Sequence, residues 1–458
     1  MIAGRRFVRL VGLIAVFGAV TGVALAGTVS WGGAIEVPGI AALNTAGIAS
    51  TTSVSCPSAG DCTAGGYYTA TGTYPNRAFV VDEKAGAWGT AIAVPGLQGL
   101  QSSSGYASVG SVSCASAGNC AAGGFYDDSS GHRQAFVVDE KAGVWGTAIE
   151  VPGTDALNTG GLAGTGPISC TSPGNCSAGG SYTINNKYTY RGFVVDETNG
   201  VWGKAVALPV PAYGVSALSC GSPGNCAAGG YGFLLNERHG KWGAPIEVPG
   251  FAALGLGHGG TPDVVSVSCA GAGNCTAGGA YDGRALVISE RNGKWGQAIR
   301  VRYASFLNHG GSAGVTSVSC ATPRDCTAGG WYTDRLGETQ AFVVSEKRGV
   351  WGSAIKLPFR RGIETFYVNL TGLSCADAGD CAATGSYQTF SHGYAFVADE
   401  KHGTWDKARE VPGTEALTQG FLNADAHAVS CARGAGACTV GGSYMDGSGL
   451  DQAFVTTP

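Results

Sequence analysis

Charged residues are scarce in this 458-residue sequence, where Asp, Glu, Lys and Arg together make up only 13%. Sustained helical periodicity is also missing beyond the N-terminus, which argues against a helical bundle. Glycine is abundant instead, at 78 residues, and this composition is typical of many short strands joined by tight turns. The chain is therefore predicted to be all-β.

An excess of positive charge is absent as well. Without Arg5, Arg6 and Arg9, the chain has 25 basic against 32 acidic residues, a net charge of about −7. Such a surface does not attract nucleic acid or anionic lipid, so we expect no nucleic-acid partner. The seven histidines show no metal-ligand spacing, and neither a metal nor another cofactor is expected.

The first 26 residues resemble an export signal. Three arginines precede an apolar run from Leu10, and Ala24-Leu25-Ala26 fits a cleavage site, which predicts a mature chain from Gly27. No Cys lies directly after the apolar run, so a lipidated N-terminus is not expected. An uncleaved anchor stays open because the run is near the lower length limit for a membrane span, and Arg5-Arg6 leaves the twin-arginine route open. We expect a secreted or cell-surface protein that does not contact the membrane after cleavage.

Sixteen cysteines form eight closely spaced pairs, whose first members lie 49 to 58 residues apart. This period indicates eight structural repeats, here called units 1 to 8. Each pair encloses five or six residues with a Gly-containing turn, and hairpin partners can lie at disulfide distance. We predict within-unit disulfides; zinc, the competing use of paired Cys, would need four ligands from two distant units. The predicted bridges join Cys56 to Cys62, Cys114 to Cys120, Cys170 to Cys176, Cys220 to Cys226, Cys269 to Cys275, Cys320 to Cys326, Cys375 to Cys381 and Cys431 to Cys438.

Four strand-like stretches recur in each unit and are called a to d; in unit 1 they are "TSVSC", "CTAGGYY", "AFVVDE" and "WGTAIAV". Unit 8 stops at Pro458 without a d stretch, while residues 28–39, "TVSWGGAIEVPG", form a d stretch without a unit. An N-terminal strand that completes the last unit predicts an eight-bladed β-propeller over 27–458, with four antiparallel strands in each blade. An open solenoid is the alternative.

The repeats resemble those of kelch-type β-propellers. Such repeats carry a Gly-Gly doublet that ends the second strand, and a third strand whose final Asp lies six residues before a Trp. The doublet recurs in every unit except unit 7, which has Thr384-Gly385, and Asp82, Asp139, Asp196 and Asp399 each precede a Trp by six. The cysteine pairs are not a kelch feature. Kelch propellers range from binding scaffolds to oxidases, so the resemblance implies a fold and no single activity.

We interpret the repeated residues as structural. Glycine doublets allow a positive φ or close packing where blades taper, and a Trp on an outer strand covers the sheet against the next blade. The paired acids of strand c, such as Asp82-Glu83, point to opposite faces of a strand and suggest turn chemistry.

Loop lengths separate two sides of the predicted ring. The a–b and c–d turns have nearly constant length and belong to one side, here called the constant face. The b–c and d–a connections vary and belong to the other, here called the variable face, where a rigid scaffold usually carries its binding site. Aromatic and Arg side chains could there hold an acidic glycan or a protein segment; the candidates are Arg302, Tyr303, Trp331, Tyr332, Arg335, Arg360, Arg361 and Tyr367.

No catalytic residue is singled out. Three functions stay open: a non-catalytic binding module for glycan or protein, which we favour, a structural extracellular protein, and a hydrolase or lyase with its site at the central channel. Convergent carboxylates or His at the channel mouth would favour the enzyme, and an aromatic groove the binding module. A monomer is expected.

Overall fold

The computed structural model describes residues 31–70, 75–210, 212–250, 261–302, 307–309, 311–359, 365, 367–420 and 423–457. The predicted signal peptide and its cleavage site lie outside these residues. Within these ranges, helices are confined to single short turns in the d–a connections: α1 (Ile40–Leu43), α2 (Leu97–Leu100), α3 (Thr154–Leu157) and α5 (Thr414–Thr418). No helix among them is long and apolar enough to cross a membrane.

Each unit contributes a hairpin of its a and b strands, joined by the predicted disulfide turn. The a strands are β2 (Ala49–Ser58), β7 (Ala107–Ser116), β12 (Ala163–Ser172), β17 (Ala217–Ser222), β22 (Asp263–Gly271), β27 (Ala313–Thr322), β32 (Tyr367–Asp377) and β37 (Ala424–Cys431). The b strands are β3 (Asp61–Thr69), β8 (Asn119–Asp127), β13 (Asn175–Thr183), β18 (Asn225–Gly230), β23 (Asn274–Tyr281), β28 (Asp325–Thr333), β33 (Asp380–Gln388) and β38 (Cys438–Met445).

The c strands follow antiparallel to the b strands. They are β4 (Asn76–Lys84), β9 (Arg133–Lys141), β14 (Tyr190–Thr198), β19 (Phe233–Arg238), β24 (Arg284–Arg291), β29 (Thr339–Lys347), β34 (Gly393–Lys401) and β39 (Asp451–Thr456).

The d stretch of units 1 to 7 is broken into two short strands, both paired with strand c of the same unit. The first pieces are β5 (Ala87–Trp88), β10 (Val144–Trp145), β15 (Val201–Trp202), β20 (Lys241–Trp242), β25 (Lys294–Trp295), β30 (Val350–Trp351) and β35 (Thr404–Trp405). The second pieces are β6 (Ile92–Ala93), β11 (Ile149–Glu150), β16 (Val206–Ala207), β21 (Ile246–Glu247), β26 (Ile299–Arg300), β31 (Ile355–Lys356) and β36 (Arg409–Glu410).

The first described strand pairs with the last one. β1 (Ala34–Glu36) runs antiparallel to β39, with Ala34 opposite Thr456 and Glu36 opposite Phe454, and completes the sheet β1-β39-β38-β37. Its side chains repeat the contacts of the internal d strands: Glu36 accepts a hydrogen bond from Tyr444 at 2.8 Å, as Glu150 does from Tyr126. The predicted pairing of residues 28–39 with unit 8 is therefore present in the described part, residues 31–39.

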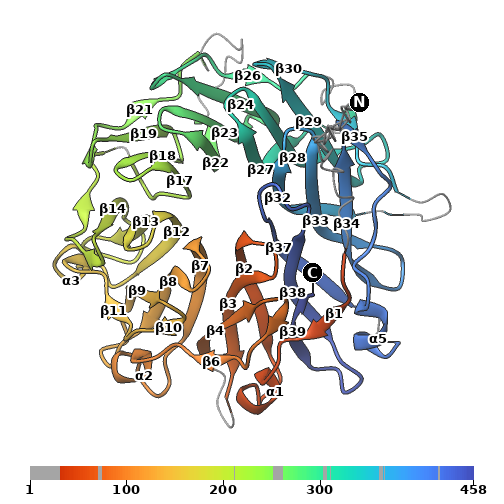
Figure 1. Ribbon diagram of the computed structural model, residues 1–458. Coiled ribbons are helices and arrows are strands. Elements are labelled where there is room, and N and C mark those ends of the chain that lie inside the picture. The colour runs from red at the N-terminus through yellow and green to blue at the C-terminus, as the bar shows by residue number, and fades with distance from the viewer. Residues whose placement is uncertain are drawn as a thin grey trace, which may run out of the picture.

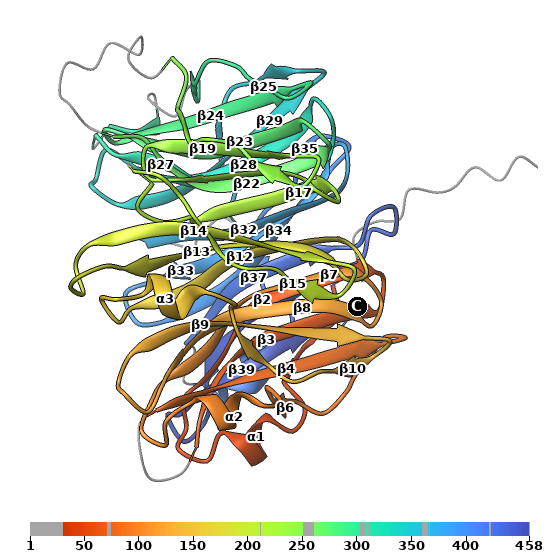
Figure 2. The same cartoon turned by 90° about the vertical axis from the view of Figure 1, so that its left-hand side faces the viewer.

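The sheets stand side by side around a central space, with the a strands innermost (Figure 1). Each a strand contacts the a strand of the next unit, and β37 contacts β2. Figure 2, a view from the side, shows the sheets packed face to face around the molecule. Twisted four-stranded sheets arranged radially in this way define a β-propeller.

The hydrophobic core lies between neighbouring sheets. One cluster, for example, joins Ala78 and Val80 of unit 1 to Val109 and Phe136 of unit 2. A fully buried Phe recurs on the c strands, at Phe79, Phe136, Phe193, Phe233, Phe342, Phe396 and Phe454. Because each sheet packs on both neighbours, the c strands are apolar on both faces, as the "AFVV" repeats require.

The glycine doublets allow close packing. A positive φ, the other role that the sequence leaves open, is not used. Neither member of a doublet has a positive φ in the described residues. A Cβ on Gly65 would lie 2.7 Å from Val109 of the next unit, and a Cβ on Gly66 would overlap the Ser50 carbonyl oxygen of its own unit. Glycine is therefore needed because two neighbours approach too closely for a side chain.

The a–b and c–d turns do lie at one end of each sheet. In unit 1, Gly86 N–H donates to the Gly60 carbonyl oxygen at 2.8 Å, and equivalent bonds recur in units 2 to 7. The c–d turn places two residues at positive φ, such as Ala85 and Gly86, which is the type I′ hairpin geometry. The Asx residue before the second Cys fixes the same turn, since Asp61 Oδ1 accepts the Ala85 N–H at 3.2 Å.

Candidate functional site

All eight predicted disulfides are present, each between directly opposed residues of strands a and b with Cα atoms 3.9–4.1 Å apart. The first Cys of each unit is bonded to the second: Cys56 to Cys62, Cys114 to Cys120, Cys170 to Cys176, Cys220 to Cys226, Cys269 to Cys275, Cys320 to Cys326, Cys375 to Cys381 and Cys431 to Cys438. No free cysteine lies in the described residues. Disulfides persist in oxidising compartments, so these pairs indicate an oxidising environment outside the cytoplasm. They belong to the scaffold beneath the constant face.

A ring of hydrogen bonds accompanies the disulfides. The Ser before the first Cys of each unit accepts the backbone N–H of the first Cys in the next unit, at 2.9–3.0 Å. The eighth bond runs from Cys56 of unit 1 to Ser430 of unit 8. The "SC" dipeptide in every unit was the sequence signal of this ring, and its meaning was missed.

Exposed aromatic side chains gather on the variable face. In the described ranges, every exposed Tyr or Phe lies on a b–c or d–a connection or at the adjoining strand end: Tyr106, Tyr188, Tyr190, Tyr213, Tyr231, Tyr367 and Phe390. The a–b and c–d turns of the constant face carry none. The two faces, predicted to differ in loop length, therefore also differ in their exposed aromatic side chains.

One aromatic pair is already assembled. Tyr213, on the connection from unit 3 to unit 4, meets Tyr231 in an edge-to-face contact with ring centroids 6.3 Å apart. Both side chains are about half exposed, at 47% and 48%. Tyr231 and Gly232 form a two-residue b–c connection, and Tyr231 also bridges to Asp263 of the next unit. This pair was not singled out in the sequence, because Tyr213 and Tyr231 are 18 residues apart on different connections.

The sector predicted around units 6 and 7 is only partly assembled. Tyr303, Arg360 and Arg361 lie outside the described residues. Arg335 is exposed on the b–c turn of unit 6, and Tyr367 comes beside that segment because β32 pairs with β29 at Thr339. Arg302 is exposed near the start of the next connection and bridges to Ser353.

The other two candidates are packed more deeply. Tyr332 is only 2% exposed and belongs to the hydrophobic core between units 5 and 6. Burial raises its pKa to about 12, and Asp334 contributes to the same shift. Trp331 is half-buried and lies against Gly314 of the adjacent strand. Tyr332 therefore cannot meet a ligand on the surface, and its alternation with Trp331 along β28 explains the difference.

The innermost strands carry few titratable groups. A bulge interrupts the pairing of strands a and b near the middle of most units, and the residues at this position include Thr52, Gly110, Val265, Thr316 and His427. The hydroxyls of Thr52 and Thr316 donate to carbonyl oxygens of the next unit. His427 is the titratable residue among them, and no group of three metal-ligating side chains is found in the described residues. Convergent acids, which would favour an enzyme, are not seen on the described residues of these strands.

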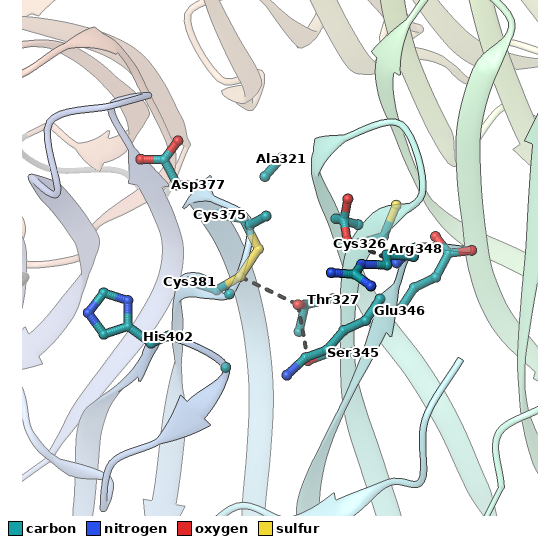
Figure 3. A pocket seen from close by; sticks show the side chains of 15 residues that line it. Ala321, Cys326, Thr327, Ser345, Glu346, Arg348, Cys375, Asp377, Cys381 and His402 are labelled. Atoms are coloured by element: carbon teal, nitrogen blue, oxygen red, sulfur yellow. Dashed lines mark hydrogen bonds between the residues drawn. A yellow bond between two sulfur atoms is a disulfide. The ribbon is translucent and has the colours of Figure 1, made fainter. Parts of the chain in front are cut away.

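Clefts of about 270 Å³ open between units on the constant face. Equivalent residues line the clefts between units 1 and 2, units 3 and 4, and units 6 and 7. Figure 3 shows the last of these, where Thr327 lies 3.4 Å from the Cys381 sulfur and 3.3 Å from Ser345 Oγ. At the corresponding places the first two clefts contain Asp82 and Asp196 in the position of Ser345, and a buried Glu beside each.

The acidic pairs of strand c are contacts between units, which corrects the turn role expected from the sequence. Trp145 Nε1 donates to Asp82 of the preceding unit at 2.9 Å, and Trp202 Nε1 donates to Asp139 at the same distance. N-terminal Trp31 makes the equivalent bond to Asp399 at 2.6 Å. The Glu that follows each Asp points the other way and is buried against the preceding unit.

The fold and these contacts define a disulfide-linked β-propeller. No family model matches the chain, and no curated protein does so significantly. Similar solved structures include the β-propeller domain of Cps50 (Swd1) from Myceliophteria thermophila, with 10% identity, a TM-score of 0.41, and coverage of 74% of this chain and 93% of that one. Hydrazine synthase from Kuenenia stuttgartiensis has 9% identity, a TM-score of 0.45, and coverage of 75% and 94%.

The acylaminoacyl peptidase of Pyrococcus horikoshii has 9% identity and a TM-score of 0.44, with coverage of 82% of this chain and 54% of the peptidase. The present chain thus spans about half the length of that enzyme. At these identities and TM-scores, the likenesses carry no argument about activity, and the fold is taken from the sheets themselves.

Proposed function

We propose that the chain is an exported, closed propeller of eight blades, one for each unit, with a kelch-like repeat. The pairing of β1 with β39, the contact of β37 with β2 and the Ser430–Cys56 hydrogen bond support closure between the first and last units. The glycine doublets and the Trp–Asp contacts support the kelch-like pattern. Closure removes an unpaired sheet edge, which would otherwise favour association.

We further propose that this propeller is a non-catalytic binding module whose ligand, a glycan or a protein segment, binds the variable face. The observation that carries the proposal is the confinement of exposed aromatic side chains to that face. Aromatic rings offer large apolar contact area together with a polar tip, so they suit both sugar rings and peptide segments.

The Tyr213–Tyr231 pair is the centre of the proposed site. Its rings are held in contact before any ligand arrives, which lowers the entropy lost on binding. Arg335 and Tyr367 of the sector between units 6 and 7 form a second contact area on the same face.

The test is a binding screen with the mature protein on a glycan array, followed by affinity measurements with any glycan that binds. Tyr213→Ala/Tyr231→Ala should weaken binding at least about fivefold, because loss of two aromatic contacts removes roughly 1–3 kcal/mol. Val350→Ala, on the outer rim and 68% exposed, is the matched control and should leave binding unchanged. Unchanged binding in the double Tyr variant would refute the site, and an empty array together with no bound protein segment would favour the structural alternative.

A further inference from the structure

Neighbouring units meet through the paired acids of strand c. Adjacent residues of a strand point to opposite faces of the sheet, so the Asp of one unit faces the next unit and the Glu faces the preceding one. Around the ring, the Asp position of each unit therefore meets the Glu of the unit that follows. The Asp and Glu of one unit cannot contact each other, but the Asp of one unit lies close to the Glu of the next unit.

The contact between units 4 and 5 shows how this position works when its hydrogen bonds are complete. Asn236 occupies the Asp position there. Its Oδ1 accepts from Trp295 Nε1 at 2.8 Å, and its Nδ2 donates to Glu290 Oε1 at 2.5 Å. The amide therefore accepts from Trp with one atom and donates to the buried Glu with the other.

Hydroxyl groups replace the amide in the next two contacts. Ser289 donates to Glu346 at 3.4 Å, and Ser345 donates to Glu400 at 3.0 Å. Glu346 also receives the Arg291 guanidinium at 2.6 Å. Each of these three buried glutamates thus has a donor from the preceding unit.

Units 1 to 3 have aspartate at the same position. The bonds from Trp145, Trp202 and Trp242 are kept, at 2.9–3.1 Å. An ionised Asp has no proton to donate, however, and no donor from the preceding unit reaches Glu140 Oε2, Glu197 Oε1 or Glu237 Oε2, which have no hydrogen-bond partner. These glutamates are only 2–4% exposed, and Glu140 and Glu237 line the clefts between units 1 and 2 and between units 3 and 4. Glu346 Oε2 also has no partner, but Ser289 and Arg291 both bond the other oxygen of that glutamate.

Few charges compensate the three contacts. Lys84 faces the Asp82–Glu140 contact and Lys141 faces the Asp139–Glu197 contact, while Asp61 lines the cleft of the first. Two further acids line the same clefts, Glu83 beside the first contact and Glu197 beside the third. The neutral neighbours are Thr63, which donates to Asp82, and Ser177, which bonds Asp196. The Asp196–Glu237 contact has no cation among the described groups that influence it.

We propose that the contacts Asp82–Glu140, Asp139–Glu197 and Asp196–Glu237 each hold one proton between their two carboxyl groups, which makes units 1 to 4 an acid-stabilised sector of the ring. The shared proton supplies the donor that Asn236 supplies between units 4 and 5. When it is lost, two negative charges face each other in a buried contact, and the interfaces between these units weaken.

The direction of the pH dependence follows from the protonation of the folded state. Burial raises the pKa of Glu140, Glu197 and Glu237 to about 7, and the facing aspartate adds to each shift. The folded protein therefore binds more protons than the unfolded chain at pH values from the ordinary Glu range to about 7. Stability is fully present below this window and is lost as the pH rises through it.

The test compares thermal unfolding from pH 5 to pH 8 at constant ionic strength. The melting temperature of the wild type should fall by at least about 5 °C over this range. Asp82→Asn/Asp139→Asn/Asp196→Asn installs the Asn236 arrangement three times and should reduce the fall by at least about half, with Glu83 remaining as a further buried acid. Asn236→Asp is the matched reverse variant: it creates a fourth carboxyl pair and should steepen the fall.

Infrared spectroscopy supplies a direct readout of the protons. At pH 6 the wild type should show the carbonyl stretch of protonated carboxylic acids, and the triple Asn variant should lose most of it. A wild-type melting temperature that is constant or rises with pH would overturn the proposal, as would an unchanged slope in both variants. A drop in melting temperature on adding EDTA at pH 6 would show that a metal ion, and not a proton, holds the pairs. If the triple variant does not fold, Asn236→Asp alone decides.

Discussion

At the scale of single residues, one position of strand c distinguishes the contacts between units. It holds Asp, Asn or Ser in units 1 to 7 and Thr457 in unit 8, and the Trp of the next unit donates to its side chain in most units. There are two exceptions: Trp88 donates to the backbone carbonyl oxygen of Thr456 at 3.1 Å, and Trp405 Nε1 is buried without a partner. The Ser289 hydroxyl bonds both Trp351 and Glu346, each at 3.4 Å, whereas the Ser345 hydroxyl donates to Glu400 at 3.0 Å and does not bond Trp405.

Ser345→Asn is therefore expected to stabilise the protein. The amide would accept from Trp405 and donate to Glu400, and satisfying a buried donor contributes about 1 kcal/mol to the free energy of unfolding. Denaturant unfolding of the variant measures this. Asn236→Ser, the reverse change, should lower stability by a similar amount; a loss of stability in Ser345→Asn would contradict the equivalence of the two positions.

Residue size is also matched between units. Unit 7 has Thr384 where other units have the first glycine of the doublet, and unit 8 has Ala426 where unit 2 has Val109. In unit 1 a Cβ at that glycine would approach Val109, so a smaller neighbour leaves room for Thr. The departure of unit 7 from the kelch-like pattern is thus compensated in unit 8.

Ala426→Val should therefore crowd Thr384 and destabilise the protein by about 1–3 kcal/mol, as overpacking does. Adding Thr384→Gly restores the arrangement of the other units and should recover most of the loss. The double-mutant cycle, followed by urea unfolding, measures this coupling. Additive effects of the two changes would show that the residues do not contact each other.

At the scale of elements, the hairpins followed from the sequence more completely than their contacts. The cysteine spacing, the turn residues and the alternating strands indicated the a–b hairpins and their disulfides, because a hairpin is specified by residues close in sequence. The partners of Trp145, Glu140 and the first doublet glycines lie in another unit, and their contacts depend on how sheets face each other. The sequence predicts that Asp and Glu point to opposite faces of a strand. Their meeting between units depends on how neighbouring sheets pack face to face.

The candidate site shows the same limit. The variable face followed from loop lengths, whereas Tyr213 and Tyr231 meet only because the short turn of unit 4 adjoins the preceding connection. Tyr332 looked like its neighbour Trp331 in the sequence, although one points into the core and the other is half-buried. Predicting which face of the sheet a side chain points to requires the register of the strand as well as its composition.

Each disulfide should contribute to the stability of its hairpin. Replacing Cys114 and Cys120 by Ala should lower the free energy of unfolding by about 2 kcal/mol, because the bridge closes a short loop in the unfolded chain. Replacing Cys431 and Cys438, which enclose one more residue, should cost nearly the same. Calorimetry of both variants under non-reducing conditions checks this; a stability equal to that of the wild type would assign the bridges a role other than stabilisation.

At the scale of the whole molecule, contacts between the first and last units resemble those between internal units. β1 pairs with the c strand of unit 8 and forms the Tyr–Glu bond, as the internal d strands do in their own units. Trp31, just before β1, forms the Trp–Asp bond to the preceding unit. Ser430 continues the hydrogen-bond ring to Cys56. The ring should therefore behave as one cooperative structure whose closure depends on residues 31–39.

A chain that starts at residue 40 should consequently melt at a lower temperature than one that starts at residue 27, and it should self-associate through the freed edge of β39. Calorimetry and light scattering after size-exclusion chromatography measure the two effects. A synthetic peptide of residues 28–39, added in excess, should restore both the melting temperature and the monomer, since a ligand that binds only the folded state stabilises it. Trp31→Phe removes the hydrogen bond to Asp399 and part of the indole packing but keeps β1, so this variant should stay monomeric with a loss of about 2 kcal/mol. A shortened chain that remains monomeric and equally stable would show that β1 is dispensable and that the ring is held by its inner strands alone.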